Sequence, residues 1–140
     1  MVKISILYKG ELRCEATHDA SNAKFITDAP VDNEGKGESF SPTDLVATAV
    51  GTCAITTMGI VAQRHNIKLD GTKVFVEKYM NTDKPRRIAK IIVQLEMCEG
   101  IPEEFREKLE NAAHKCPVEK SLHPDVVIDM SFIYPKKIKN

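Results

Sequence analysis

The four cysteines of this sequence, Cys14, Cys53, Cys98 and Cys116, offer the most chemistry. Only the thiolate form of cysteine is a nucleophile, so the surroundings of each thiol decide its reactivity. Cys14 lies on the apolar side of an alternating stretch, which favours a small core residue. Cys98 ends another alternating stretch on its polar side, with no evident partner. Cys53 and Cys116 are therefore the candidates for chemistry.

The local sequence treats these two thiols differently. Cys53 lies within residues 45–63, a stretch without a charged residue. A thiol buried among apolar side chains has a raised pKa and is usually inert. Cys116 directly precedes Pro117 at a predicted helix start, where backbone N–H groups and the neighbouring Lys115 favour the thiolate. Taken alone, the local sequence favours Cys116 as the more reactive thiol.

Two other roles are open for Cys116. It continues the apolar stripe of the preceding predicted helix, which includes Leu109 and Ala113, and this pattern is also typical of a core residue. His114, Cys116 and His123 could in principle hold a metal ion. Their spacing matches no zinc-binding pattern well, so we expect no metal and no other cofactor.

The stretch around Cys53 predicts the helix about which the chain is organised. Ser41 and Pro42 are typical of a helix start, and Asp44 is placed to bond back to Ser41. Apolar and small residues then occur on every side, so we expect a helix that is buried on every side. The stretch is as long as a membrane span, but four Thr, two Gly and a Gln make it a poor one. We therefore expect no membrane partner.

The rest of the chain predicts a mixed fold. Alternation of apolar and polar residues predicts strands over residues 2–8, 12–18, 24–28, 74–80, 91–97 and 126–134. An amphipathic helix begins after Pro102, and a short second helix follows Pro117. The predicted order is β-β-β-α-β-β-α-α-β, which is an α+β fold in which antiparallel sheet predominates. We expect one domain over residues 1–140.

Composition narrows the possible partners and the compartment. The 140 residues include 20 basic and 20 acidic ones, which favours neither nucleic acid nor an anionic membrane as a partner. The N-terminal apolar run is too short and too alternating for a signal peptide, so we expect a cytoplasmic protein. A central helix of about 22 residues is roughly 33 Å long. A single chain of this size would struggle to cover it, so we expect a homodimer.

Two segments, SPTDLVATAVGTC and CPVEKSL, resemble the OsmC/Ohr family of thiol-dependent peroxidases. The specific features are the Pro-x-x-Leu helix start at Pro42, the position of Cys53 eleven residues later, and Cys-Pro-Val at residues 116–118. The resemblance covers nearly the whole chain, including the order of elements. It implies an intertwined homodimer, with two central helices enclosed by sheets from both chains.

The resemblance also implies an activity. In the family, a peroxidatic thiolate attacks an organic hydroperoxide and becomes a sulfenic acid, which a resolving thiol converts to a disulfide. An external dithiol then restores the pair. By position, Cys53 is the peroxidatic thiol and Cys116 the resolving thiol. The implied role is a response to oxidative stress.

Two family residues do not match in this chain. The family has Glu directly after the helix-start Pro, where this sequence has Thr43; Asp44 faces the opposite side of the helix, about 13 Å along it from Cys53. The family Arg has no counterpart in residues 19–40, and Arg13 falls on the polar face of a predicted strand. Without this Arg we expect a near-normal thiol pKa for Cys53. The alternative is a non-catalytic or weakly active OsmC-like protein that binds a small apolar or acyl ligand near Cys53.

Overall fold

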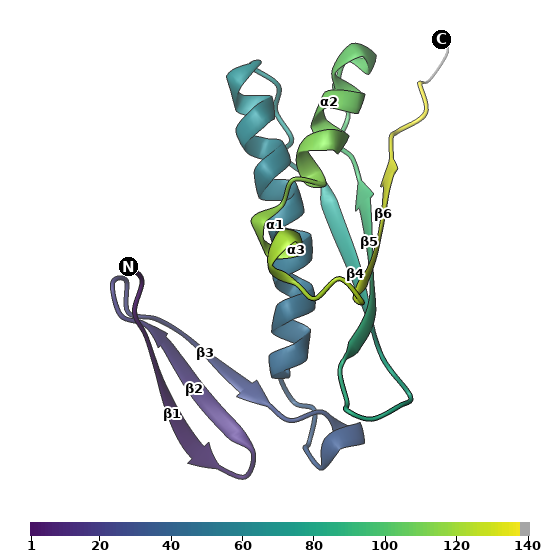
Figure 1. Ribbon diagram of the computed structural model, residues 1–140. Helices are drawn as coiled ribbons and strands as arrows, with labels where there is room; N and C mark the ends of the chain where they lie inside the picture. Colours follow the sequence, from purple (N-terminus) through teal and green to yellow (C-terminus); the bar gives the residue numbers. More distant parts are fainter. Residues whose placement is uncertain (138–140) are drawn as a thin grey trace. The chain divides into compact units, whose positions relative to one another are not determined.

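The predicted order of elements is confirmed by the computed structural model, which describes residues 1–137 (Figure 1). The elements are β1 Ile4–Gly10, β2 Arg13–His18, β3 Ala23–Asp28, a 3₁₀ turn Val31–Asn33, α1 Pro42–Arg64, β4 Lys73–Met80, β5 Ile88–Glu96, α2 Glu103–Ala113, α3 Pro117–Ser121 and β6 Val127–Ile133. The fold is α+β. The chain divides into two compact units, Met1–Val46 and Ala47–Asn140, so the single domain over residues 1–140 stays a prediction.

The first unit is built on an antiparallel sheet in the order β1-β2-β3. Ile6 lies opposite Ala16, which in turn lies opposite Phe25, so these apolar residues share one face of the sheet. That face carries Ile4, Ile6 and Tyr8, whose exposed fractions are 62%, 69% and 61%. We predicted one wet face for the first hairpin. The large apolar side chains of this face are exposed as well.

The start of α1 forms as the sequence predicts. The Asp44 N–H donates to Ser41 Oγ over 3.1 Å, and the Ser41 N–H donates to Asp44 Oδ2 over 2.8 Å. This reciprocal pair is a capping box, which satisfies two of the N–H groups that a helix start leaves unpaired. Asp44 therefore acts at the helix terminus.

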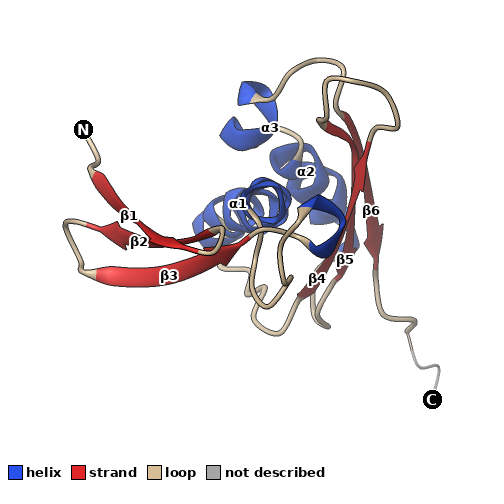
Figure 2. Cartoon of the chain, turned by 90° about the horizontal axis from the view of Figure 1, so that it is seen from below, coloured by secondary structure: helices blue, strands red, loops and turns tan. Residues whose placement is uncertain are grey.

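In the second unit a mixed sheet supports the three helices. Its order is β4-β5-β6, with β4 and β5 antiparallel and β5 and β6 parallel. Figure 2 shows α1, α2 and α3 on the same side of this sheet. The buried core between them consists of Ala47, Val50, Ala54, Met58, Ala62, Ile91, Val93, Leu95, Met97, Ile101, Leu109 and Ala113.

In the single chain α1 is buried on one side, which agrees with the expectation that one chain of this size would struggle to cover it. Burial of α1 on every side stays a prediction for the dimer. The buried residues of α1 form one stripe at helical spacing: Ala47, Val50, Gly51, Ala54, Met58 and Ala62. Thr52, Thr56 and Ile60, on another side, are exposed. By length and composition α1 would also qualify as a membrane span, with a mean hydropathy of 1.9, but core helices of soluble proteins pass the same test.

Candidate active site

Cys53 lies on α1, which packs closely against the sheet. A Cβ atom added to Gly51 would lie 2.6 Å from Val76 Cγ2, so only glycine allows the helix to approach β4 this closely. Two residues further along, Cys53 lies beside the buried Ala54 and is itself half-buried. The thiol is thus at the edge of the core, where it loses part of its hydration but stays accessible.

Cys116 is positioned by the junction between α2 and α3. Pro117 cannot continue α2 and instead occupies the first turn of α3, so Cys116 becomes the N-cap residue of that helix. Its Sγ accepts the Glu119 N–H over 3.4 Å. The predicted N-cap position is confirmed, and the side chain is completely buried.

The fold brings these two cysteines together within the second unit. The Cys53 and Cys116 side chains are hydrogen-bonded to each other, and the Val118 N–H also donates to the Cys53 sulfur. Thr57 lies one turn along α1, with its Oγ1 4.0 Å from Cys53 Sγ and donating to the Cys53 carbonyl over 2.8 Å. Both thiols are free, so the site is a reduced dithiol.

The pKa values of the two thiols are shifted in opposite directions. Burial opposes the thiolate at Cys53, but hydrogen bonds from Cys116, the Val118 N–H and Thr57 outweigh it and lower the pKa of Cys53. Burial and the hydrogen bond to Cys53 raise the pKa of Cys116 above its ordinary value. The local sequence favoured Cys116 as the more acidic thiol, and this was wrong because its burial outweighs the N–H groups at the start of α3.

The near-normal pKa expected for Cys53 is also corrected. That expectation assumed that only a cation could stabilise the thiolate, whereas here the donors are neutral groups on two segments. Val118 is 65 residues beyond Cys53, and no local pattern connects them. Thr57, in contrast, stands four residues after Cys53 on the same helix face, which is a signal that the sequence offered.

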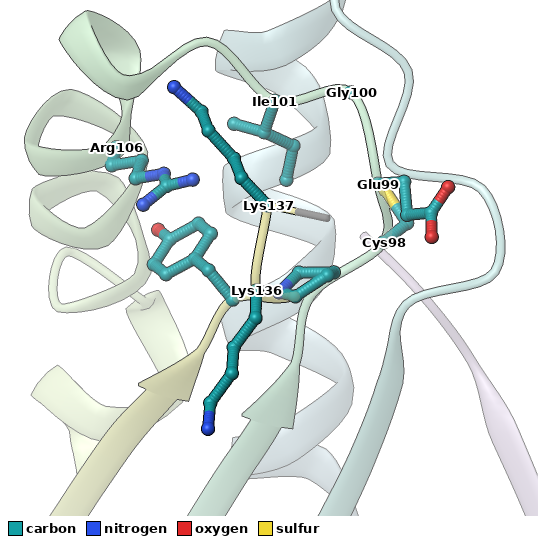
Figure 3. A pocket seen from close by; sticks show the side chains of 9 residues that line it. Cys98, Glu99, Gly100, Ile101, Arg106, Lys136 and Lys137 are labelled. Carbon is teal, nitrogen blue, oxygen red and sulfur yellow. The ribbon is translucent and has the colours of Figure 1, made fainter. Parts of the chain in front are cut away.

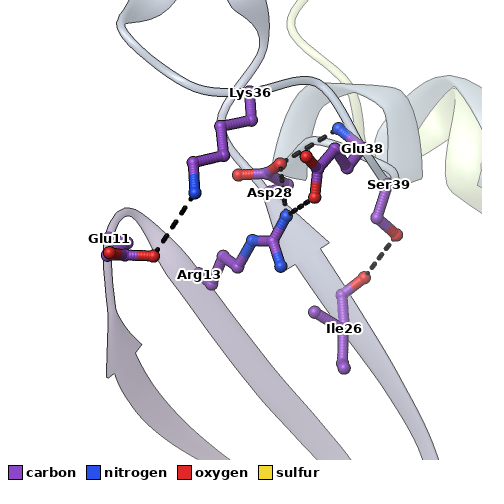
Figure 4. Close-up of polar contacts among 7 residues, drawn as sticks. All are labelled: Glu11, Arg13, Ile26, Asp28, Lys36, Glu38 and Ser39. Atoms are coloured by element: carbon purple, nitrogen blue, oxygen red, sulfur yellow. Dashed lines mark hydrogen bonds and ion pairs between the residues drawn. The ribbon is translucent and has the colours of Figure 1, made fainter.

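Arg13 is engaged inside the first unit (Figure 4). Its guanidinium donates to Glu38 and, over 3.4 Å, to Asp28 Oδ2, which also accepts the Glu38 N–H over 3.0 Å. The pKa of the fully buried Asp28 is lowered, first by the hydrogen bond from the Glu38 N–H and then by the charge of Arg13. Burial acts in the opposite direction but is outweighed. Arg13 is thus half-buried in a network of carboxylates, where we expected a solvated strand face. Thr43, at the family Glu position, contacts Ser41 Oγ over 3.2 Å.

Apart from a cavity of about 650 Å³ lined by residues between Thr56 and Asp70, two further cavities of the second unit lie away from the dithiol. One, of about 330 Å³, is lined by Cys98, Glu99, Gly100, Ile101, Arg106, Tyr134, Pro135, Lys136 and Lys137 (Figure 3). There Cys98 Sγ donates to the Lys68 carbonyl over 3.5 Å, so the thiol has a partner that the sequence did not indicate. The other cavity, also of about 330 Å³, is lined by Thr48, Gly51, Thr52, Ile55, Val74 and Val76. Neither is lined by Cys53 or Cys116.

No metal site accompanies the dithiol in the part of the chain that the structure describes. Within residues 1–137, no group of three or more His, Cys, Asp and Glu side chains is placed to hold a metal ion. His114 and His123 are both exposed, whereas Cys116 is buried. The dithiol itself offers the chemistry of two adjacent thiols of unequal acidity.

Comparison with known proteins places the chain in a family. A family model described as OsmC-like protein matches residues 35–131. A Psychrobacter arcticus 273-4 protein with a suggested role in osmotic stress and detoxification response is 40% identical, with a TM-score of 0.89 over 94% of this chain and 96% of that chain. The fold is shared with the organic hydroperoxide resistance protein OsmC of Legionella pneumophila, which is 17% identical, with a TM-score of 0.75 over 95% of this chain and 96% of that chain. It is also shared with the organic hydroperoxide resistance protein OhrB of Bacillus subtilis, which is 20% identical, with a TM-score of 0.68 over 94% of this chain and 97% of that chain. Among curated proteins, none matches the chain. The chain belongs to the OsmC-like protein family.

Proposed function

We propose that this protein is a thiol-dependent peroxidase that reduces organic hydroperoxides through a Cys53/Cys116 dithiol–disulfide cycle. Family membership supports a redox or peroxidase role, and the Legionella and Bacillus relatives are organic hydroperoxide resistance proteins. The observation that carries the proposal is the direct hydrogen bond between two free thiols, of which Cys53 is the more acidic. A nucleophile needs the lower pKa, and a resolving thiol needs to be within contact.

The cycle follows from these positions. The Cys53 thiolate attacks the outer oxygen of the hydroperoxide, the O–O bond breaks, and the alkoxide leaves as an alcohol after taking a proton. Cys53 is then a sulfenic acid. Cys116 displaces its hydroxyl group as water and forms the Cys53–Cys116 disulfide. An external dithiol reduces this disulfide, so the thiols carry both electrons and the cycle needs no cofactor.

The proposed assembly is a cytoplasmic homodimer. Its support is the amount of apolar surface that a single chain leaves open, including the β1 face with Ile4 and Ile6 and the side of α1 with Ile60. Monomeric proteins seldom expose contiguous apolar surface on this scale. A reducing cytoplasm would also keep free thiols available for the cycle.

The test is to map disulfides after treatment with one equivalent of an organic hydroperoxide such as cumene hydroperoxide. Alkylation of the remaining thiols and peptide mass spectrometry should show Cys53 joined to Cys116, with Cys14 and Cys98 alkylated. The Cys98→Ser variant, which alters a thiol outside the dithiol, should give the same pair. Recovery of a free Cys53 with a different pair joined would rule the cycle out.

The second candidate function is binding of a small apolar or acyl ligand without turnover. The observation that favours it is the cavity of about 330 Å³ lined mainly by Gly51, Ile55, Val74 and Val76, on the helix that carries Cys53. Absence of the family Glu at Thr43 points the same way. Under this reading, hydroperoxide would leave the thiols reduced, so the mapping experiment separates the two functions.

A further inference from the structure

The cavity beside Arg106 is a part of the second unit that the dithiol cycle does not use. It forms where the end of β5, the first turns of α2 and the segment that follows β6 come together (Figure 3). Its volume of about 330 Å³ is at the lower end of the range of small-molecule sites. Ile101, Tyr134 and Pro135 supply an apolar lining, and Arg106 supplies a charge. A pocket of this size and lining suits a small organic ligand with one charged group.

Arg106 is held in place by an aromatic ring and not by a carboxylate. Its guanidinium carbon Cζ lies 4.2 Å from the centroid of the Tyr134 ring, which is a cation–π contact. The Tyr134 hydroxyl donates to Glu110 Oε1 over 2.8 Å, and this hydrogen bond fixes the ring. Among residues 1–137, no acid forms an ion pair with Arg106, and its buried Nε has no hydrogen-bond partner. Because the N–H bonds lie in the plane of the guanidinium, stacking on its face leaves the Nη donors open to an anion.

The acids near Arg106 are engaged by other groups or point elsewhere. Glu103, one turn earlier on α2, has its Oε1 3.1 Å from Lys137 Nζ. The hydrogen bond from Lys137, and then the charges of Lys137 and Arg106, lower the pKa of Glu103. Glu110 already accepts the hydroxyl described above. Figure 3 shows that the side chain of Glu99 points away from Arg106. The α2 side of the cavity therefore presents a guanidinium that no carboxylate of the described chain neutralises.

We propose that this cavity binds a small organic acid, whose carboxylate pairs with Arg106 and whose apolar part lies against Ile101 and Tyr134. A planar guanidinium and a carboxylate match in a bidentate geometry, and a half-buried pair is screened less by salt than a surface pair. The apolar lining favours an organic acid over an inorganic anion, which would gain nothing from burial against these side chains. Since neither Cys53 nor Cys116 lines the cavity, the site does not depend on the proposed peroxidase cycle.

The test is an NMR titration of the reduced, ¹⁵N-labelled protein with benzoate. Benzamide has the same ring without the charge, and inorganic phosphate has a charge without the ring, so both are titrated at the same ionic strength. We expect saturable shifts with benzoate at the amides of Gly100 and Ile101, and far weaker binding of the other two probes. Arg106→Gln should raise the dissociation constant of benzoate about 10–100-fold, the usual effect of removing a hydrogen bond to a charged group. Lys108→Gln removes an exposed cation elsewhere on α2 and is the matched control, which should bind like the wild type.

Alkylation of Cys98 gives a second readout, which needs no variant. The Cys98 side chain lines the cavity, so benzoate should slow its reaction with iodoacetamide. The reaction of Cys14, which lies in the first unit, should not change. This comparison decides the question even if Arg106→Gln fails to fold, which its own ¹⁵N spectrum would reveal.

Four results would overturn the inference, and none of them bears on the dithiol cycle. Unchanged benzoate affinity in Arg106→Gln would show that the carboxylate is bound elsewhere. Equal binding of benzamide would make the cavity an apolar pocket without anion recognition, and equal binding of phosphate would show that only charge is recognised. Absence of both the amide shifts and the protection of Cys98 at the highest soluble benzoate concentration would reject the site altogether.

Discussion

Replacing Cys53 by Ser should abolish hydroperoxide consumption, with a loss on the order of a thousandfold or more, because it removes the nucleophile on which every later step depends. Serine has nearly the same size, and the position is only half-buried, so the fold should persist. Hydroperoxide consumption is measured with an excess of an external dithiol. Circular dichroism and thermal unfolding verify that the variant remains folded.

Two matched variants make this result specific. Cys116→Ser should still form a Cys53 sulfenic acid, but should stop there, with no intramolecular disulfide. Cys98→Ser alters a thiol whose partner is the Lys68 carbonyl, and it should behave as the wild type. If Cys53→Ser retained most of the activity, the reacting group would be another residue and the proposed cycle would be wrong.

Substituting Ile6 by Asp should dissociate the dimer. Ile6 is 69% exposed in the single chain, and substitutions at such positions usually change monomer stability by less than about 0.5 kcal/mol. In a dimer that buries this face, each lost Ile costs about 1.5–3 kcal/mol, and two copies are lost per dimer. Because about 1.4 kcal/mol corresponds to tenfold, the dissociation constant should rise roughly 10²–10⁴-fold.

Sedimentation velocity across a dilution series measures this change. Ser5→Asp is the matched control, since Ser5 is also exposed and points to the other face of the same strand. It should dimerise like the wild type. A dimer of unchanged affinity in Ile6→Asp would show that this sheet face is not an interface.

Local patterns in the sequence were enough to predict the order of strands and helices and the residues at which α1 and α3 begin. The capping box between Ser41 and Asp44, the N-cap at Cys116 and the order of strands and helices all depend on residues within a few positions of one another. Such features can be predicted because side chains close in the sequence bond the free backbone groups at the ends of each element. The family motifs added the pairing of two thiols that are far apart in the sequence.

Features that depend on tertiary contacts could not be predicted. The pKa of Cys53 is lowered by a thiol and an N–H group that are more than sixty residues away in the sequence. The pKa of Cys116 is raised by burial, which the basic residues next to it in the sequence gave no reason to expect. Arg13 looked solvated because its partners Asp28 and Glu38 come from other segments. The apolar composition of α1 showed that the helix needs cover on every side, but it did not show which side the chain's own sheet covers.

The pH dependence of the Cys53 reaction tests the central claim most directly. In a Cys14→Ser, Cys98→Ser background, the rate of hydroperoxide-dependent Cys53 oxidation is measured from pH 5 to pH 10. Because hydrogen bonds to the sulfur lower the pKa of Cys53, the rate should reach half its maximum at a lower pH than the ionisation of an ordinary thiol would give. Removing the Cys116 donor with Cys116→Ala should shift the profile upward. A rate that keeps rising beyond pH 9 in the parent protein, or a profile that Cys116→Ala leaves in place, would contradict the account.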